Sequence, residues 1–167
     1  KIICGYPWFK LKHEKIPKHL VESHGFFNIF NFFIRGSYKL KFFSEYLNIL
    51  NKQNIDKIAC KYTDQADVLI ALTGTGLNAG KKIIKNDKIY VCERASSHIV
   101  FQNEILSEEY KEFNQPKFTI NKWFIDRELK EYEEANIILV PSSFVKKSFE
   151  NFNINKTRVL EFGVNLK

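Results

Sequence analysis

The segment ERASSH, residues 93–98, places a carboxylate, a guanidinium, two hydroxyls and an imidazole close together in the chain. Arg94 carries the planar fork of donors that binds anions, and His98 can donate or accept a proton near neutral pH. We therefore take Arg94 and His98 as candidate catalytic residues, with Glu93 and Ser97 as candidate substrate contacts. A serine hydrolase is excluded, because the chain has no G-x-S-x-G motif and sequence neighbours seldom form the required Ser–His hydrogen bond.

The same segment has a second interpretation, in which it only begins a helix. Ser96 or Ser97 is then the N-cap, and His98 lies in the first turn. In this interpretation, Glu93 and Arg94 form an ion pair that is exposed to solvent. The residues themselves leave both interpretations open.

A glycine-rich segment, TGTGLNAGKK at 73–82, follows a short apolar run. Backbone amides in front of a helix can cradle a phosphate or a sugar. The segment is neither a P-loop nor a dinucleotide fingerprint, because it lacks the Gly-Lys-Ser/Thr ending and the G-x-G-x-x-G spacing. A tight turn with a threonine as helix cap is the alternative. The candidate substrate-binding residues of this segment are Thr73, Gly74, Thr75 and Gly76.

Two later loops complete the set of candidate sites. In VPSSFVKK, residues 140–147, Ser142 is either a helix N-cap or a substrate contact. In EFGVN, residues 161–165, Gly163 indicates a turn or a close approach of the backbone to another group.

Short apolar runs predict four strands, at 67–72, 88–93, 136–141 and 158–162. Runs without alternation are typical of strands buried on both faces of a parallel sheet. Helical patterns at 98–113, at 120–135 and after Ser142 separate them. This alternation predicts an α/β fold with a doubly wound, Rossmann-like parallel sheet. Ligands of such sheets bind outside the carboxyl ends of the strands, where the four candidate loops lie.

The first half of the chain is less regular. The segment IIC at 2–4 predicts a strand, and 42–52 and 55–65 predict helices. The Phe-rich segment 26–43 has two interpretations: core helices with a loop, or an amphipathic surface that contacts an anionic membrane. Since no linker interrupts the sequence, we expect a single domain over 1–167.

Composition limits the classes of binding partner that the chain is expected to have. The net charge of +7 favours anionic partners, but the basic residues are scattered, which disfavours nucleic acid. Cys4, Cys60 and Cys92 have no zinc or redox spacing and indicate buried thiols in a reducing compartment. The histidines at 13, 19 and 24 have no metal-ligand spacing, so no metal is expected. With no signal peptide and no apolar run of about 20 residues, we expect a cytoplasmic protein, with the inner face of the membrane as a second location.

The last part of the chain resembles a known family. Segment 125–166 combines a Glu-rich helix, the strand and turn A-N-x-I-x-V-P-S-x-F-V, a short helix with S-F, and G-V-N-L. It resembles the end of the N-terminal domain of glycosyltransferase family 4, the retaining enzymes of GT-B fold. Segment 93–110 resembles R-x-S-x-H followed by Gln and an acidic pair, which occurs in a bacterial subset of these enzymes. The resemblance covers 88–167 well and 66–87 loosely.

The resemblance implies two Rossmann-like domains, with the acceptor on the N-terminal one and the nucleotide-sugar donor on the C-terminal one. The chain would be the acceptor-side domain, cut at both ends and inactive alone, with a glycan or lipid-linked acceptor. No cofactor or metal is implied, because retaining transfer in this fold depends on positioning and on stabilising the leaving phosphate. Arg94 would orient acceptor or donor. Arg94→Ala is then expected to reduce transfer without unfolding the domain, and His98→Ala to reduce it less.

Two other functions stay open. One is a non-catalytic Rossmann-like module that binds a phosphorylated metabolite. The other is a scaffold or membrane-peripheral protein built around residues 26–43.

Overall fold

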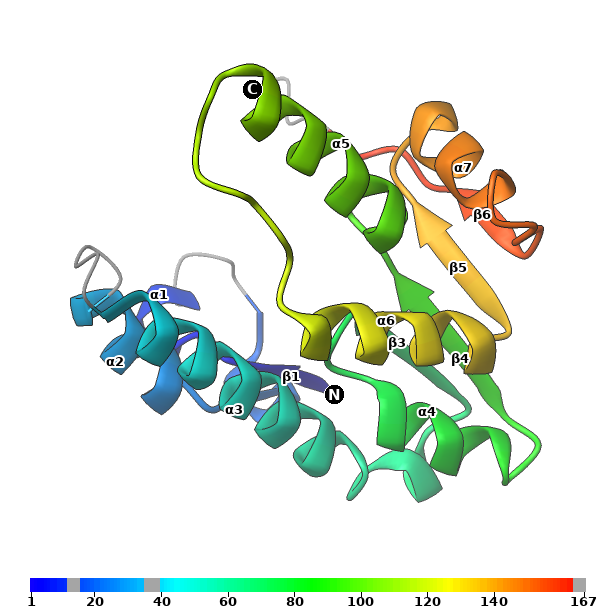
Figure 1. Cartoon of the computed structure of the whole chain (residues 1–167). Coiled ribbons are helices and arrows are strands. Elements are labelled where there is room, and N and C mark those ends of the chain that lie inside the picture. Colours follow the sequence, from blue (N-terminus) through cyan, green and yellow to red (C-terminus); the bar gives the residue numbers. More distant parts are fainter. Residues whose placement is uncertain (12–15, 35–39, 164–167) are drawn as a thin grey trace. The chain divides into compact units, whose positions relative to one another are not determined.

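A computed structural model of the chain describes residues 1–11, 16–34 and 40–163 (Figure 1). The chain divides into two compact units, Lys1–Thr63 and Asp64–Lys167. The strands pair in parallel in both units, and helices connect them. The predicted α/β class with a Rossmann-like parallel arrangement is confirmed, whereas the single domain expected from the sequence stays a prediction.

The first unit combines a two-stranded sheet with two longer helices. Its elements are β1 (Ile2–Cys4), α1 (Trp8–Leu11), the 3-10 turn η2 (Lys18–Leu20), β2 (Val21–Ser23), α2 (Phe26–Ile34) and α3 (Lys41–Ala59). Strand β1 confirms the prediction for IIC and pairs with β2, which the sequence did not reveal. The two helices predicted at 42–52 and 55–65 are wrong as separate elements, because α3 runs through the polar residues between them.

Helix α2 carries most of the Phe-rich segment and buries none of its residues. Phe26 and Phe33 are 75% and 78% exposed, and Phe42 at the start of α3 is 85% exposed. The interpretation of this segment as core helices is therefore wrong for its described part, while residues 35–39 lie outside the described residues. Among the described helices, none combines the length and the apolarity needed to cross a bilayer.

The second unit is built on a four-stranded parallel sheet. Its elements after the turn η4 (Thr63–Gln65) are β3 (Val68–Leu72), α4 (Leu77–Ile84), β4 (Ile89–Glu93), α5 (Ile99–Glu112), α6 (Lys122–Glu134), β5 (Ile137–Val140), α7 (Ser143–Glu150) and β6 (Thr157–Val159). Strands β3, β4 and β5 confirm three of the apolar runs, and α5, α6 and α7 confirm the predicted helices. The strand predicted at 158–162 is confirmed only at its start, because β6 ends at Val159. The spatial order β3-β4-β5-β6 follows the sequence.

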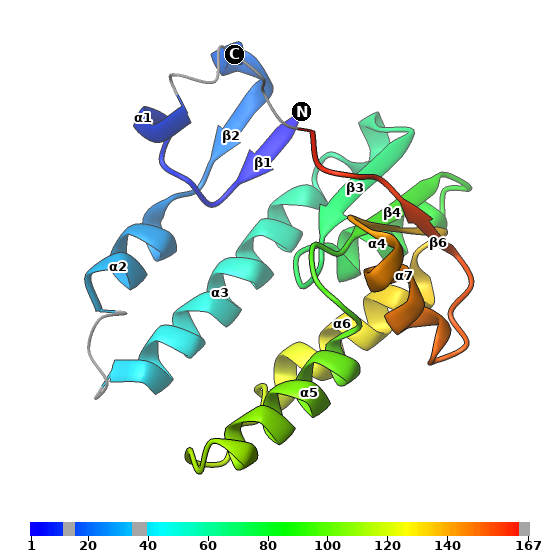
Figure 2. The same ribbon diagram turned by 90° about the horizontal axis from the view of Figure 1, so that it is seen from above.

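Helices α4, α6 and α7 pack against one face of this sheet (Figure 2). Crossovers between parallel strands are right-handed, so a strand order that runs in one direction places successive helices on the same face. On β3, the side chains of Val68, Ile70 and Leu72 are about half exposed. The second unit by itself therefore does not bury β3 on both faces, and burial of this strand on both faces stays a prediction.

The core of the second unit lies between that covered face and the helices. Its largest fully buried apolar side chains are Tyr90 from β4, Ile138 from β5, Ile83 from α4, and Tyr132 and Phe149 from α6 and α7. Burying apolar side chains of this size stabilises a fold by about 1.5–3 kcal/mol each. This layer fixes the helices that supply the buried charges described below.

Gly80 in α4 lets this helix approach the Tyr90 ring. A Cβ at this position would lie 2.5 Å from two ring carbons of Tyr90, whose side chain is fully buried. Alanine is a better helix former by about 1 kcal/mol, but overpacking a tight core costs about 1–3 kcal/mol. We expect Gly80→Ala to lower the free energy of unfolding in urea, and Lys81→Ala, at an exposed position of the same helix, to change it little. Equal stabilities of the two variants would contradict this packing.

Candidate functional site

The carboxyl ends of the strands form the edge at which the sequence placed the site. Glu93, the last residue of β4, is in register with Leu72 at the end of β3 and with Leu139 in β5. A hollow of about 220 Å³ opens at this edge. Its lining comes from the ends of β4, β5 and β6: Glu93, Arg94, Ala95, Leu139, Val140, Pro141, Leu160, Glu161, Phe162 and Gly163. Three of the residues predicted from the sequence, Glu93, Arg94 and Gly163, thus come together.

The glycine-rich loop does hold an anion with its backbone, but the anion belongs to the chain itself. The amides of Gly74 and Gly76 both donate to the carboxylate of Glu131 from α6, the second over 2.9 Å. Gly74 has φ 86°, a conformation that favours glycine. Its carbonyl accepts from Nε of Arg127 over 2.7 Å. These amides are therefore directed at Glu131 rather than at a bound phosphate or sugar.

Burial and hydrogen bonding act in opposite directions on the Glu131 carboxyl, which is fully buried. Burial, the larger effect, raises its pKa, while the two glycine amides and Arg127, whose Nε lies 3.7 Å away, lower it. A buried carboxylate is tolerated in proteins only where it is paired and hydrogen-bonded. Glu131 thus ties the β3–α4 loop to α6.

Arg94 points its guanidinium inward. Nη1 lies 2.9 Å from Oε2 of Glu128, a pair that is about nine-tenths buried. Nη2 donates to Gln102 over 2.6 Å, and Nε donates to the carbonyl of Ser97 over 3.0 Å. Nη1 also lies 3.4 Å from the hydroxyl of Thr73. The side chain therefore joins the ends of β3 and β4 to α5 and α6, and its role in substrate binding stays a prediction.

His98 is part of the core rather than of the edge hollow. It is 1% exposed and stacks on Phe152, with ring centroids 4.0 Å apart, beside Tyr132 and Phe149. Its backbone amide donates to Oγ of Ser148 over 2.9 Å. The imidazole therefore stands apart from the carboxyl edge, and its catalytic role stays a prediction.

The predicted caps are partly wrong. Helix α5 begins at Ile99 with His98 as the N-cap, so neither Ser96 nor Ser97 caps it. Helix α4 has Gly76 as its N-cap, and the Thr75 hydroxyl donates to the Leu72 carbonyl instead. The physical reason is that a buried charge fixes each loop. Arg94 holds the loop before α5, and Glu131 holds the loop before α4, so the serine and threonine hydroxyls of these loops do not reach the cap position.

Ser142 and Gly163 have simpler environments. Ser142 is the N-cap of α7, and its hydroxyl accepts from the amide of Val145 over 3.3 Å, which confirms the capping interpretation. Gly163 is exposed, and an added Cβ would meet no atom within 4 Å. The prediction that the backbone of Gly163 lies close to another group is therefore wrong for the described part of the chain.

The burial of charged side chains on α6 is the feature that the sequence did not reveal. Arg127, Glu128 and Glu131 are all at least nine-tenths buried, although charged residues of a Glu-rich helix normally face solvent. Glu128 also accepts from the Tyr132 hydroxyl over 2.8 Å. The available signal was the i, i+4 spacing of Arg127 with Glu131 and of Glu128 with Tyr132, which places these side chains on one face.

Burial of His98 makes the stability of the second unit depend on pH. Burial and the charge of Arg94 lower the pKa of His98 from its usual 6.5 to about 4. Between these values the unfolded chain binds a proton that the folded chain does not, so stability is complete above pH 6.5 and is lost as pH falls. We expect a loss of about 2 kcal/mol between pH 7.5 and pH 5.

The check is urea unfolding of the wild type and of His98→Phe across this pH range. The stability difference between the two proteins should shift by that amount in favour of His98→Phe at pH 5. Parallel pH curves would contradict a neutral, buried imidazole.

The described residues show neither a metal-binding cluster nor, at Cys92, a reactive thiol. Among the described residues, no group of three or more His, Cys, Asp or Glu side chains is arranged to hold a metal ion, and His13 lies outside those residues. Cys92 is fully buried in β4, and burial raises the pKa of its thiol far above the ordinary value. It therefore serves as a small core side chain.

Comparison with known proteins adds no assignment: no protein-family model matches the chain, and neither a curated protein nor a solved structure matches it significantly.

Proposed function

We propose that the chain is the acceptor-side domain of a retaining bacterial glycosyltransferase, and that a second Rossmann-like domain supplies the nucleotide-sugar site. The observation that carries the proposal is the hollow at the carboxyl edge, where the ends of β4, β5 and β6 meet. Ligands of open parallel sheets bind at this edge. The resemblance of 93–110 and 125–166 to family 4 glycosyltransferases supports the reaction class.

The lining of the hollow suits an uncharged sugar better than a phosphate. Glu93 and Glu161 contribute carboxylates that can accept hydrogen bonds from sugar hydroxyls. Pro141, Leu160 and Phe162 add apolar surface, against which the C–H face of a sugar ring can pack. The volume of about 220 Å³ is on the scale of one sugar ring. An acceptor would therefore present a single terminal sugar here.

The alternative, a module that binds a phosphorylated metabolite, has weaker support. The strongest candidate anion donors in the sequence were the glycine-loop amides and Arg94. The amides of Gly74 and Gly76 donate to Glu131, and Arg94 pairs with Glu128 and Gln102. Both sets of donors thus form hydrogen bonds or ion pairs with groups of the chain itself.

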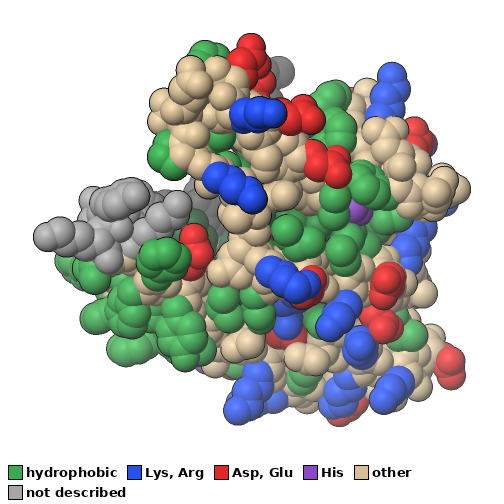
Figure 3. Space-filling view, in the orientation of Figure 1, with side chains coloured by type: hydrophobic (Ala, Val, Ile, Leu, Met, Phe, Trp, Pro, Cys, Tyr) green, Lys and Arg blue, Asp and Glu red, His purple; other side chains and the backbone are tan. Residues whose placement is uncertain are grey.

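The exposed side chains of α2 support a second part of the proposal, peripheral contact with an anionic membrane. Figure 3 shows hydrophobic side chains gathered on the first unit. Phe26, Phe32 and Phe33 are more than half exposed, and Nζ of Lys10 lies 5.5 Å from the Phe32 ring centroid. Exposed aromatic residues beside basic ones are typical of interfacial helices.

We expect the chain to co-sediment with phosphatidylglycerol vesicles at low salt, and less at 0.5 M salt, because screening weakens the electrostatic attraction. Phosphatidylcholine vesicles are the control. Equal sedimentation with both lipids, or with neither, would contradict anionic membrane contact.

Chemical-shift mapping tests the acceptor site in the chain itself. A panel of methyl glycosides of hexoses and N-acetylhexosamines is titrated against ¹⁵N-labelled protein, with uridine and guanosine diphosphates as the comparison. We expect at least one glycoside to shift the amides of Ala95, Glu161 and Gly163, and the nucleotides to leave them unchanged. Shifts by the nucleotides alone would contradict the proposal and favour the metabolite-binding module.

A further inference from the structure

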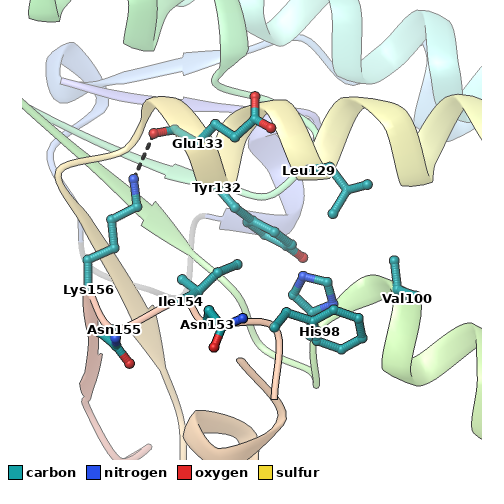
Figure 4. Close-up of a pocket in the computed structure, with 10 residues that line it drawn as sticks. His98, Val100, Leu129, Tyr132, Glu133, Asn153, Ile154, Asn155 and Lys156 are labelled. Atoms are coloured by element: carbon teal, nitrogen blue, oxygen red, sulfur yellow. Dashed lines mark hydrogen bonds between the residues drawn. The ribbon is translucent and has the colours of Figure 1, made fainter. Parts of the chain in front are cut away.

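A cavity of about 620 Å³ in the second unit lies beside α6 and the connection from α7 to β6 (Figure 4). Tyr132, Phe149 and Phe152 enclose the His98 ring beside it, and both ring nitrogens are fully buried. The imidazole therefore offers no hydrogen bond to a molecule in this cavity. Lys156, which also lines it, already donates to a backbone carbonyl of α6, as the dashed line marks.

A cavity of similar size in the first unit has polar side chains within reach of a ligand. Its volume is about 670 Å³, within the range of sites for small molecules. The lining comes from α1 and the loop before it, from α2, and from the first half of α3.

Side-chain amides and a hydroxyl lie side by side in the wall of this cavity. Nδ2 of Asn31 donates to Oδ1 of Asn48 over 3.1 Å, and the Ser44 hydroxyl donates to Oδ1 of Asn31. Among the described residues, the Asn48 amide nitrogen donates to no other group, which leaves its two N–H donors for a ligand. The Ser44 oxygen can still accept a hydrogen bond. This wall therefore matches a ligand that carries hydroxyl groups.

The rim of the same cavity is aromatic. Phe9, Phe32 and Phe33 line it and are 60%, 59% and 78% exposed, whereas Asn31 and Ser44 are only partly exposed. Sites for small molecules usually have the opposite arrangement, a mostly apolar interior with a few polar groups. An apolar rim around a polar interior suits a lipid in a bilayer, because the rings can enter the acyl region while the headgroup occupies the interior.

Charge selects an anionic occupant. Residues 1–63 carry 11 Lys and Arg against 4 Asp and Glu, while residues 64–167 carry 15 of each, so the whole net charge of +7 belongs to the first unit. Lys10 lines the cavity, and its Nζ lies 5.5 Å from the ring centroid of Phe32. A second copy of the chain would bring the same positive charge to the aromatic rim and is therefore disfavoured.

We propose that this cavity binds the headgroup of one anionic phospholipid whose headgroup is a polyol, of the phosphatidylglycerol class. Lys10 pairs with the phosphate, and the three phenylalanines of the rim contact the acyl chains. The headgroup hydroxyls accept from the Asn48 amide and donate to the Ser44 oxygen. This inference rests on the membrane contact proposed above and adds the class of lipid that the contact selects.

The test compares vesicles that contain phosphatidylglycerol with vesicles that contain phosphatidylmethanol, each in the same proportion to phosphatidylcholine. The two anionic lipids have equal charge, and only phosphatidylglycerol has headgroup hydroxyls. Co-sedimentation of the 167-residue chain gives the affinity for each. We expect about fivefold tighter binding to phosphatidylglycerol, as one net hydrogen bond predicts.

Two outcomes would overturn the inference in different ways. Equal binding to the two anionic lipids, above the binding to phosphatidylcholine alone, would remove the headgroup site and leave the membrane contact. Binding to neither anionic lipid would contradict the headgroup site and the membrane contact together.

Two variants locate the site. Asn48→Leu keeps the approximate shape of the side chain, removes its donors, and should abolish the preference for phosphatidylglycerol. Ile29→Trp, at an exposed position in the cavity wall, narrows the cavity and should also abolish the preference, which keeps the test decisive if Asn48→Leu does not fold. Gln53→Leu, at an exposed position of α3 outside the cavity, is the control and should keep it. A fivefold preference retained by Asn48→Leu and Ile29→Trp would refute the site.

Discussion

Replacing Glu131 with alanine should lower the free energy of unfolding of the second unit by about 3–5 kcal/mol. The substitution leaves the amides of Gly74 and Gly76 without their acceptor and Arg127 without its buried counter-charge. Glu131→Gln keeps the shape and one acceptor oxygen, so a smaller loss is expected. Urea unfolding in a Trp8→Phe background measures the effect, because the fluorescence then comes from Trp123 in α6 of the second unit.

The matched control lies on the same helix. Glu134 is about one-third exposed and lies 3.4 Å from Nζ of Lys81 at the surface. Exposed ion pairs contribute about 0–1 kcal/mol, so Glu134→Ala should have a small effect. Equal losses in Glu131→Ala and Glu134→Ala would show that the glycine loop is not held by a buried carboxylate and would leave its amides available for a ligand.

Arg94→Ala is expected to cost a similar 3–5 kcal/mol, because it leaves the buried carboxylate of Glu128 without its cation. This expectation differs from the one drawn from the sequence, in which the substitution reduced activity and left the fold intact. The cause is the inward direction of the guanidinium toward Glu128 and Gln102.

A double-mutant cycle of Arg94→Ala and Glu128→Gln tests whether the guanidinium stabilises the fold or is available to bind a substrate. Glu128→Gln removes the uncompensated charge, so the double variant should be more stable than Arg94→Ala alone, with a coupling energy of about 1–3 kcal/mol. A coupling energy near zero, with Arg94→Ala as stable as the wild type, would instead leave the guanidinium available to a substrate.

The sheet of the second unit could be predicted because its signals are local. The runs at 67–72, 88–93 and 136–141 are short, apolar and bounded by polar turns, and each contains its strand. Strand β2 has three residues with a charged centre and no such signal. Helix α3 was divided in two because polar residues interrupt its apolar spacing, yet helices tolerate polar residues that face outward.

The site was predicted less well, because its decisive contacts join residues far apart in the sequence. The glycine loop was interpreted either as a cradle for a phosphate or sugar or as a capped turn, whereas its amides hold a carboxylate of the chain itself, 55 to 57 residues away. His98 was treated as a site residue for its chemistry, whereas Tyr132 and Phe152 surround it only after α6 and α7 have packed. No burial was predicted for the charged residues of the Glu-rich helix, yet tertiary packing buries three of them.

The measurement that tests the proposed function most directly is sugar transfer by the enzyme expressed from its natural gene. Nucleotide-sugars are the donors, and membrane extracts and soluble glycans are the acceptors. Ala95→Trp fills the hollow from an exposed position, and Lys85→Trp, exposed at the opposite edge before β4, is the control. We predict transfer by the wild type and by Lys85→Trp, and a loss of about 100-fold in kcat/KM for the acceptor in Ala95→Trp. Wild-type transfer by Ala95→Trp, or no transfer by the wild type from any donor, would contradict the assignment of this edge as the acceptor wall of a glycosyltransferase.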